Sequence, residues 1–116
     1  MGSDIVFFAW NRSIPGRENL SSEHFDEFVK YLQALNEAGT ITSWDVVFLN
    51  EHGGDMNGFF LLHGEPTSLD ALLGTEQWVT HMARATMHLE NAGAVRGRAG
   101  SSVMKFMAIW RNSIPD

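Results

Sequence analysis

The side chains of this chain that can exchange protons near neutral pH are its five histidines. His63 is the first candidate for general acid/base chemistry, because it alternates with Phe59 and Leu61 on one face of a predicted strand. A polar side chain at such a position needs a hydrogen-bonding partner. It is therefore either a catalytic group in a pocket between sheet and helices or a structural histidine. If it points into a sheet–sheet interface, we expect the structural role.

Two further histidines share one face of a predicted long helix. His81 and His88 are seven residues apart and lie on the same side as Arg84. This face either lines a pocket, with His81 as an axial metal or haem ligand, or is solvated. The spacing differs from the i, i+4 spacing of a two-histidine metal site on a helix. His24 falls in the first turn of another predicted helix, beside acidic residues, and is expected to be exposed.

The aromatic residues predict an interior that suits a flat apolar ligand. The chain has four tryptophans, eight phenylalanines and six methionines. Bulky rings line pockets for such ligands, and they also fill cores. The residues that we expect to line a pocket between sheet and helices are Trp10, Asn11, Trp44, His63, Trp78 and His81.

Composition excludes several classes of function. The formal net charge of −6 disfavours binding to nucleic acid or to an anionic membrane surface. The chain has no cysteine, which excludes disulfides, thiolate catalysis and cysteine-ligated metals. No apolar run approaches the ~20 residues of a membrane span, and the first residues lack the pattern of a signal peptide. We therefore expect a cytoplasmic protein.

The pattern of strands and helices predicts one α+β domain over residues 1–116 with a ferredoxin-like βαββαβ order. Gly39 is the predicted stop of the first helix, which Ser21 or Ser22 begins. The predicted strands are 4–11, 41–50, 56–64 and 102–111, and the later helices are 68–73 and 75–91. The segment 96–101 is expected to be a flexible lead-in to the last strand. The result is a four-stranded antiparallel sheet with helices on one face.

The predicted strands are apolar on both faces, which a sheet with one wet face would not be. Residues 5–10 read IVFFAW, and 46–49 and 59–62 are equally apolar. Two helices cover one face of such a sheet, so the other face needs a different cover. A second copy of the chain is the cover that we expect, which makes the protein a homodimer joined through its sheet faces.

This pattern resembles the dimeric α+β barrel superfamily, in which two ferredoxin-like subunits pack sheet to sheet. Segment 8–12, FAWNR, resembles the end of the first strand of haem-degrading monooxygenases, where an asparagine faces the substrate; Asn11 takes that place. Segment 69–78, LDALLGTEQW, resembles the short-helix-then-long-helix segment of the same group. A histidine on that long helix ligates haem iron, and His81 lies within one position of it. His24 is similar in place to a helical histidine of YCII-related proteins.

The function expected from the residues and the resemblance is binding of a small molecule. The leading hypothesis is a cofactor-independent monooxygenase or isomerase acting on a small apolar or aromatic substrate, with His63, Asn11 and His81 as catalytic residues and Trp10, Trp44 and Trp78 as binding residues. It implies no bound cofactor. One alternative is a haem-binding or haem-degrading monooxygenase, and another is a non-catalytic oligomeric binding module.

Overall fold

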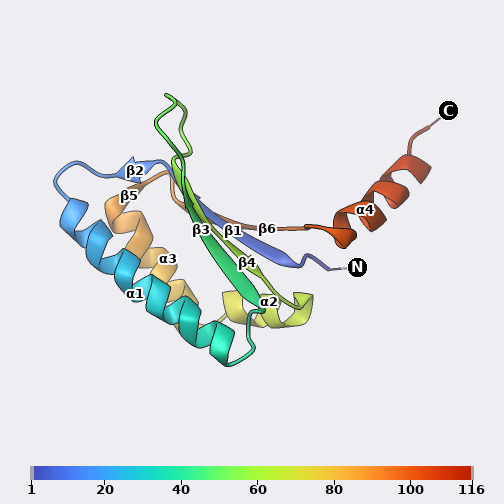
Figure 1. Ribbon diagram of the computed structural model, residues 1–116, viewed down its shortest axis with the longest axis horizontal. Coiled ribbons are helices and arrows are strands. Elements are labelled where there is room, and N and C mark those ends of the chain that lie inside the picture. The colour runs from blue at the N-terminus through green and yellow to red at the C-terminus, as the bar shows by residue number, and fades with distance from the viewer. Residues whose placement is uncertain (1, 116) are drawn as a thin grey trace.

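The fold is a four-stranded antiparallel sheet with two long helices against one of its faces (Figure 1). The computed structural model describes residues 2–115. The strands are β1 (Ile5–Trp10), β2 (Arg12–Ser13), β3 (Ser43–Phe48), β4 (Gly58–His63), β5 (Leu89–Glu90) and β6 (Gly93–Gly97). The helices are α1 (Glu18–Glu37), α2 (Pro66–Leu73), α3 (Glu76–His88) and α4 (Ser101–Asn112). The predicted βαββαβ order is confirmed by the elements from β1 to β6.

The sheet has the strand order β3-β4-β1-β6, with β1 in antiparallel register between β4 and β6. Val6 of β1 is paired with Leu62 of β4, and Phe8 is paired with Phe60. Because side chains alternate along a strand, all four point to the same face, and all four are buried. The core therefore lies between this face and the helices, which add residues such as Leu32.

Within residues 2–115, no helix packs over the opposite face of the sheet as α1 and α3 do over the first. It carries alternate residues of the same strands, including Ile5, Phe7, Phe59 and Leu61, and these side chains are half-buried. Phe7 and Phe59 form an edge-to-face ring pair with centroids 4.9 Å apart. Val95 of β6 continues this apolar face and is 62% exposed. We refer to it below as the open sheet face.

The C-terminal part of the chain differs from the sequence prediction. The strand predicted over 102–111 is the helix α4, and the fourth strand of the sheet is β6, at Gly93–Gly97. The predicted lead-in 96–101 therefore includes the end of a strand. β6 pairs through its backbone with β1, so its glycines do not prevent it from forming an edge strand.

The start of the first long helix and the end of the second also differ from the sequence prediction. α1 begins at Glu18, ahead of the predicted serines, and Gly39 follows its end with φ +79° as predicted for a helix stop. α3 ends at His88, short of the predicted Asn91, because the chain turns into β5. Thr75 caps its start by accepting a hydrogen bond from the backbone N–H of Trp78.

A small second sheet joins the start of α1 to the end of α3. β2 pairs with β5 in antiparallel fashion, and the backbone N–H of Ile14 donates to the carbonyl of His88 at 2.8 Å. Arg17 also donates to the carbonyl of Met87. These contacts hold the first turn of α1 beside the last turn of α3, which is where the candidate site lies.

Candidate active site

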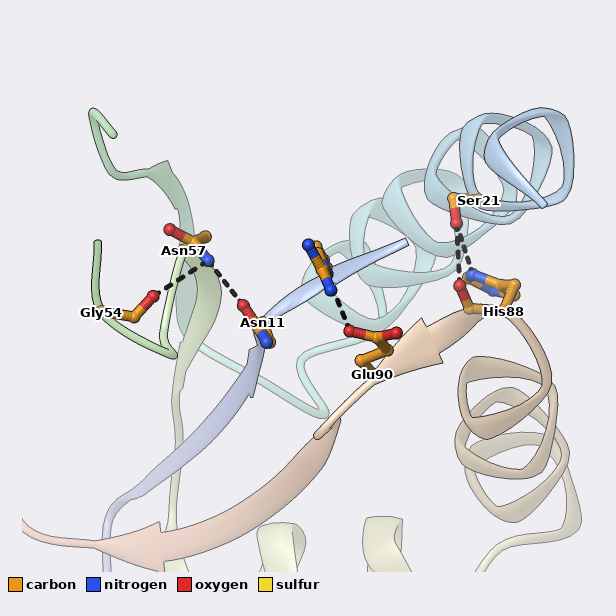
Figure 2. Close-up of polar contacts among 7 residues, drawn as sticks. Asn11, Ser21, Gly54, Asn57, His88 and Glu90 are labelled. Atoms are coloured by element: carbon orange, nitrogen blue, oxygen red, sulfur yellow. Dashed lines mark hydrogen bonds and ion pairs between the residues drawn. The ribbon is translucent and has the colours of Figure 1, made fainter. Parts of the chain in front are cut away.

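A chain of hydrogen bonds runs through five side chains at the α1–α3 interface. Ser13 Oγ donates to Ser21 Oγ at 2.7 Å, and Ser21 Oγ lies 2.7 Å from Nδ1 of His88. Nε2 of His88 is 2.8 Å from Nδ1 of His24, and Nε2 of His24 is 2.9 Å from Nδ1 of His81. We call these five residues the serine–histidine chain. Figure 2 shows its Ser21–His88 link, between α1 and the end of α3.

The helices bring these residues together from distant parts of the sequence. Ser21 and His24 are three apart on α1, so they share one face of that helix. His81 and His88 are seven apart on α3 and share a face there. When the two helices pack side by side, His24 lies between the two histidines of α3 and contacts both.

Burial in this interface was not expected from the sequence. His24 is 4% exposed and His88 is 5% exposed. The predicted exposed position of His24 is therefore wrong, and of the two alternatives for the helix face that carries His88, a pocket-lining face fits this residue and a solvated one does not. The nitrogens of both rings are hydrogen-bonded within the serine–histidine chain. These bonds offset the cost of removing a polar group from water, so the rings can be buried. The rings of His24 and His81 are nearly parallel, with an interplanar angle of 5° and centroids 5.2 Å apart.

The electrostatic surroundings keep the histidines neutral. Burial, and after it the charge of Arg84 and the electrostatic influence of His81 and His88, lowers the pKa of His24 from its ordinary 6.5 to about 4, against the opposing effect of Glu27. Burial and Arg84 also lower the pKa of His81 and of His88. Arg84 is itself held by an ion pair with Glu27. At neutral pH the three imidazoles are therefore uncharged.

Neutral rings leave two consistent directions for the protons. In one, Ser21 donates to His88, His88 to His24, and His24 to His81, so that Nε2 of His81 carries the last proton. In the other, every imidazole donates the opposite way, toward Ser21. One direction becomes the other when a proton enters at Ser21 and another leaves at Nε2 of His81. The serine–histidine chain can thus relay a proton, and its three imidazoles are neutral both before and after the transfer.

One end of the serine–histidine chain opens into a cavity of about 320 Å³ between sheet and helices. Ser13, Ser21, His24 and His88 lie in its wall. The rest of the wall is mainly aromatic and includes Phe8, Trp10, Phe25, Phe28, Phe48 and Phe60. The cavity therefore combines a large apolar surface with one group of polar atoms, an arrangement typical of sites for small apolar molecules.

Of the residues predicted to line this cavity, Trp10 lies in its wall and the others lie elsewhere. His63 is on the open sheet face, away from α1 and α3, because it alternates with the buried Leu62; it borders a separate hollow with Pro66 and Ser102. Asn11 accepts a hydrogen bond from Nδ2 of Asn57 at 2.8 Å, as Figure 2 shows. Trp44 packs beside the ring of Phe60.

The two remaining predicted residues lie behind the cavity. Trp78 is buried and borders a different hollow, between α3 and β6. His81 is one link behind the cavity wall, with its Nδ1 on His24 and its ring against Tyr31, at 4.5 Å between centroids. Their predicted roles in substrate binding and catalysis stay predictions.

The described residues contain no group of three or more His, Asp or Glu side chains arranged to hold a metal ion. The histidines of the serine–histidine chain illustrate why. His24 directs its two nitrogens to opposite sides, toward His88 and toward His81, so the three rings cannot converge on one ion in this arrangement. Neither His81 nor Asn11 lies in the wall of the 320 Å³ cavity, and the haem alternative stays a prediction.

Comparison with solved structures supports the fold. The PA3566 protein of Pseudomonas aeruginosa is similar with a TM-score of 0.58 and 16% identity, over 86% of this chain and 97% of that one. A dimeric protein of unknown function and ferredoxin-like fold from Bacteroides fragilis has a TM-score of 0.56 and 13% identity, over 82% and 95% of the two chains. The NE2512 protein of unknown function from Nitrosomonas europaea has a TM-score of 0.51 and 20% identity, over 84% and 92%.

The chain has a ferredoxin-like fold. No protein-family description and no curated protein matches its sequence. At these identities the structural relatives establish the arrangement of the chain and leave its chemistry to be argued from the site. Within residues 2–115, none of the helices combines the length and the apolar character needed to cross a membrane.

Proposed function

We propose that the protein binds a small, flat, apolar molecule in the 320 Å³ cavity and moves a proton on it. The observation that carries this proposal is the serine–histidine chain, which starts in the cavity wall and continues through the α1–α3 interface. The aromatic wall provides the surface for an apolar ring. The polar atoms of Ser21 and His88 provide the place where a carbonyl or hydroxyl group of the ligand would bind.

The reaction class that this arrangement favours is isomerisation through an enol or enolate. A proton leaves a carbon of the substrate and passes to Ser21 Oγ, while Ser21 gives its own proton to His88. His88 passes a proton to His24, His24 passes one to His81, and the partly exposed His81 gives its Nε2 proton to solvent water. The reverse sequence returns a proton to a different atom of the substrate, so the step balances without a co-reactant.

The expected cofactor-independent monooxygenase chemistry begins with the same proton abstraction. In that case molecular oxygen would be the second substrate and would add to the resulting carbanion. The serine–histidine chain supports the abstraction step in both reactions, and we propose the isomerase because it needs no further reactant.

Hydrogen–deuterium exchange of an enolisable ketone tests this function. The probe is 2-indanone, a flat neutral bicycle, and its loss of α-protons in deuterium oxide is followed by proton NMR. We expect the protein to accelerate exchange and the His88→Gln variant to lose about 100-fold or more of the acceleration, the usual contribution of a positioned acid or base. His52→Gln is the matched control, because His52 is an exposed histidine in the loop between β3 and β4, away from the cavity wall. Equal rates for wild type and His88→Gln would contradict the proposal.

We also propose that the working unit is a homodimer joined through the open sheet face. Phe7 and Phe59 on that face are half-buried, and no helix of the described residues packs over them; an apolar face of this kind marks an interaction surface. The Bacteroides relative is described as dimeric. Phe7→Glu should convert the dimer to monomers in sedimentation equilibrium, whereas Lys30→Glu, on the partly exposed helix α1, should not.

A further inference from the structure

Helix α4 stands apart from the rest of the subunit. It leaves the body beyond the end of β6 and projects outward beside the N-terminal end of the described chain (Figure 1). None of its residues is buried. Its ties to the subunit are near its start, where Ser102 Oγ donates to the carboxylate of Asp4 at 2.9 Å, and at Phe106, which lies under the guanidinium of Arg98.

The exposed surface of α4 carries an apolar stripe. Phe106, Met107 and Trp110 recur at spacings of one, three and four residues, and Val103 extends the stripe toward the helix start. Phe106 is 40% exposed and Trp110 is 51% exposed. An isolated helix of 12 residues is marginal in water. A helix of this length with an aromatic stripe therefore needs a surface to pack against.

We infer that α4 packs on the open sheet face of a second copy of the chain. The inference rests on the proposed homodimer and adds an exchanged arm to it. α4 departs from β6, the edge strand that carries the exposed Val95 of the open sheet face. When two such faces pair around a two-fold axis, each arm leaves the edge of its own sheet and reaches the margin of the partner's sheet.

The dimensions fit this arrangement. A 12-residue helix is about 18 Å long, and the outer strands of a four-stranded sheet are about 14 Å apart. The arm is thus long enough to follow the margin of the partner's open sheet face while the centres of the two faces pack together. Each subunit then contributes both an arm and an acceptor surface, so the contact is made twice.

A membrane surface is the other class of partner that a helix of this composition could meet. α4 has two cationic side chains, Lys105 and Arg111, and no acidic one. The whole chain, however, has a net charge of −6, which an anionic membrane would repel. The uncovered apolar sheet face of the same chain therefore favours a second copy.

Sedimentation equilibrium of arm variants is the first test. Trp110→Glu places a charge in the stripe, and Ala108→Glu places the same charge on the opposite side of the helix. We expect the first to raise the dimer dissociation constant at least roughly 100-fold, since a large aromatic anchor is lost at both arms, and the second to leave it nearly unchanged. If Trp110→Glu left the dimer dissociation constant unchanged, the contact of α4 with the partner would be excluded, while the dimer through the sheet faces would not. A monomeric wild type would overturn both.

Cross-linking decides whether the arm reaches the other subunit. The chain has no cysteine, so Trp110→Cys in one preparation and Val95→Cys or Val47→Cys in a second, affinity-tagged preparation give defined pairs at the two sheet edges. After the two preparations are mixed and mildly oxidised, we expect a disulfide between Cys at position 110 of one chain and Cys at position 95 or 47 of the other. If neither pair forms a disulfide, the inference is wrong. So would arm-dependent co-sedimentation with phosphatidylglycerol vesicles together with an unchanged dimer.

Discussion

The burial of His24 should make the protein lose stability as the pH falls through the range in which histidine ordinarily takes up a proton. Burial, followed by the charges of Arg84, His81 and His88, lowers its pKa from 6.5 in a free chain to about 4. Between these two values the unfolded chain is protonated at His24 and the folded chain is not. The unfolded state then binds more protons, so the free energy of unfolding falls as the pH is lowered.

The size of the effect follows from the two pKa values. The full difference between 6.5 and about 4 corresponds to roughly 3 kcal/mol, and about 2 kcal/mol of it is lost between pH 7 and about pH 4.5. The lowered pKa values of His81 and His88 act in the same direction. For a domain of this size, about 2 kcal/mol is a substantial part of the total stability.

Urea unfolding at several pH values measures this loss. Tryptophan fluorescence is a suitable signal because Trp78 is 3% exposed in the folded protein. All samples have the same protein concentration, because the apparent stability of an oligomer depends on it. His24→Gln keeps a side chain that donates and accepts hydrogen bonds but cannot titrate. We expect its unfolding free energy to fall by about 2 kcal/mol less than that of wild type over the same pH range.

The comparison is between the pH dependences, since His24→Gln lowers the stability at every pH by disturbing the hydrogen bonds to His81 and His88. His52→Gln is the matched control. His52 is an exposed histidine near the tip of the loop between β3 and β4, where it contacts the carbonyl of Met56. If His24→Gln retained the whole pH dependence of wild type, the assignment of a buried neutral histidine would be wrong.

Three further substitutions test the packing around the site. Thr75→Ala removes the N-cap of α3 and should lower the free energy of unfolding by about 1 kcal/mol, as measured by urea unfolding. Gly58→Ala places a Cβ 2.5 Å from the ring of Trp10, so it should cost about 1–3 kcal/mol and alter near-ultraviolet circular dichroism. Arg12→Ala removes an exposed ion pair with Glu90 and should change stability by no more than about 1 kcal/mol; a larger loss would mean that β2 and β5 depend on it.

The sequence was sufficient to predict the order of elements up to the last strand. Runs such as 59–62 have the length and composition of buried strands, and their apolar character on both sides predicted the open sheet face. The last strand was misplaced because Val103, Lys105 and Met107 alternate as they would in a strand, while Gly93 and Gly97 resemble a loop. An edge strand that is held by backbone hydrogen bonds needs no distinctive side chains. The sequence of β6 therefore lacks the apolar pattern by which a strand is predicted.

The candidate site could be predicted only in part. The shared face of His81 and His88 was visible from their spacing, and the aromatic content predicted an apolar cavity. The link through His24 could not be seen, because it joins residues 57 and 64 positions apart and depends on how α1 packs against α3. His63 was placed in the cavity because a single sequence does not show which face of a strand meets the helices.

The serine–histidine chain has a consequence for how the protein responds to heat. Its links cross between α1 and α3, so a small separation of these helices would break the path of the proton before the sheet is disturbed. Water entering the gap would also return the histidines toward ordinary solution behaviour. We therefore expect the proposed proton-transfer activity to disappear at a lower temperature than the β-sheet signal, because the two signals depend on separate layers of the fold.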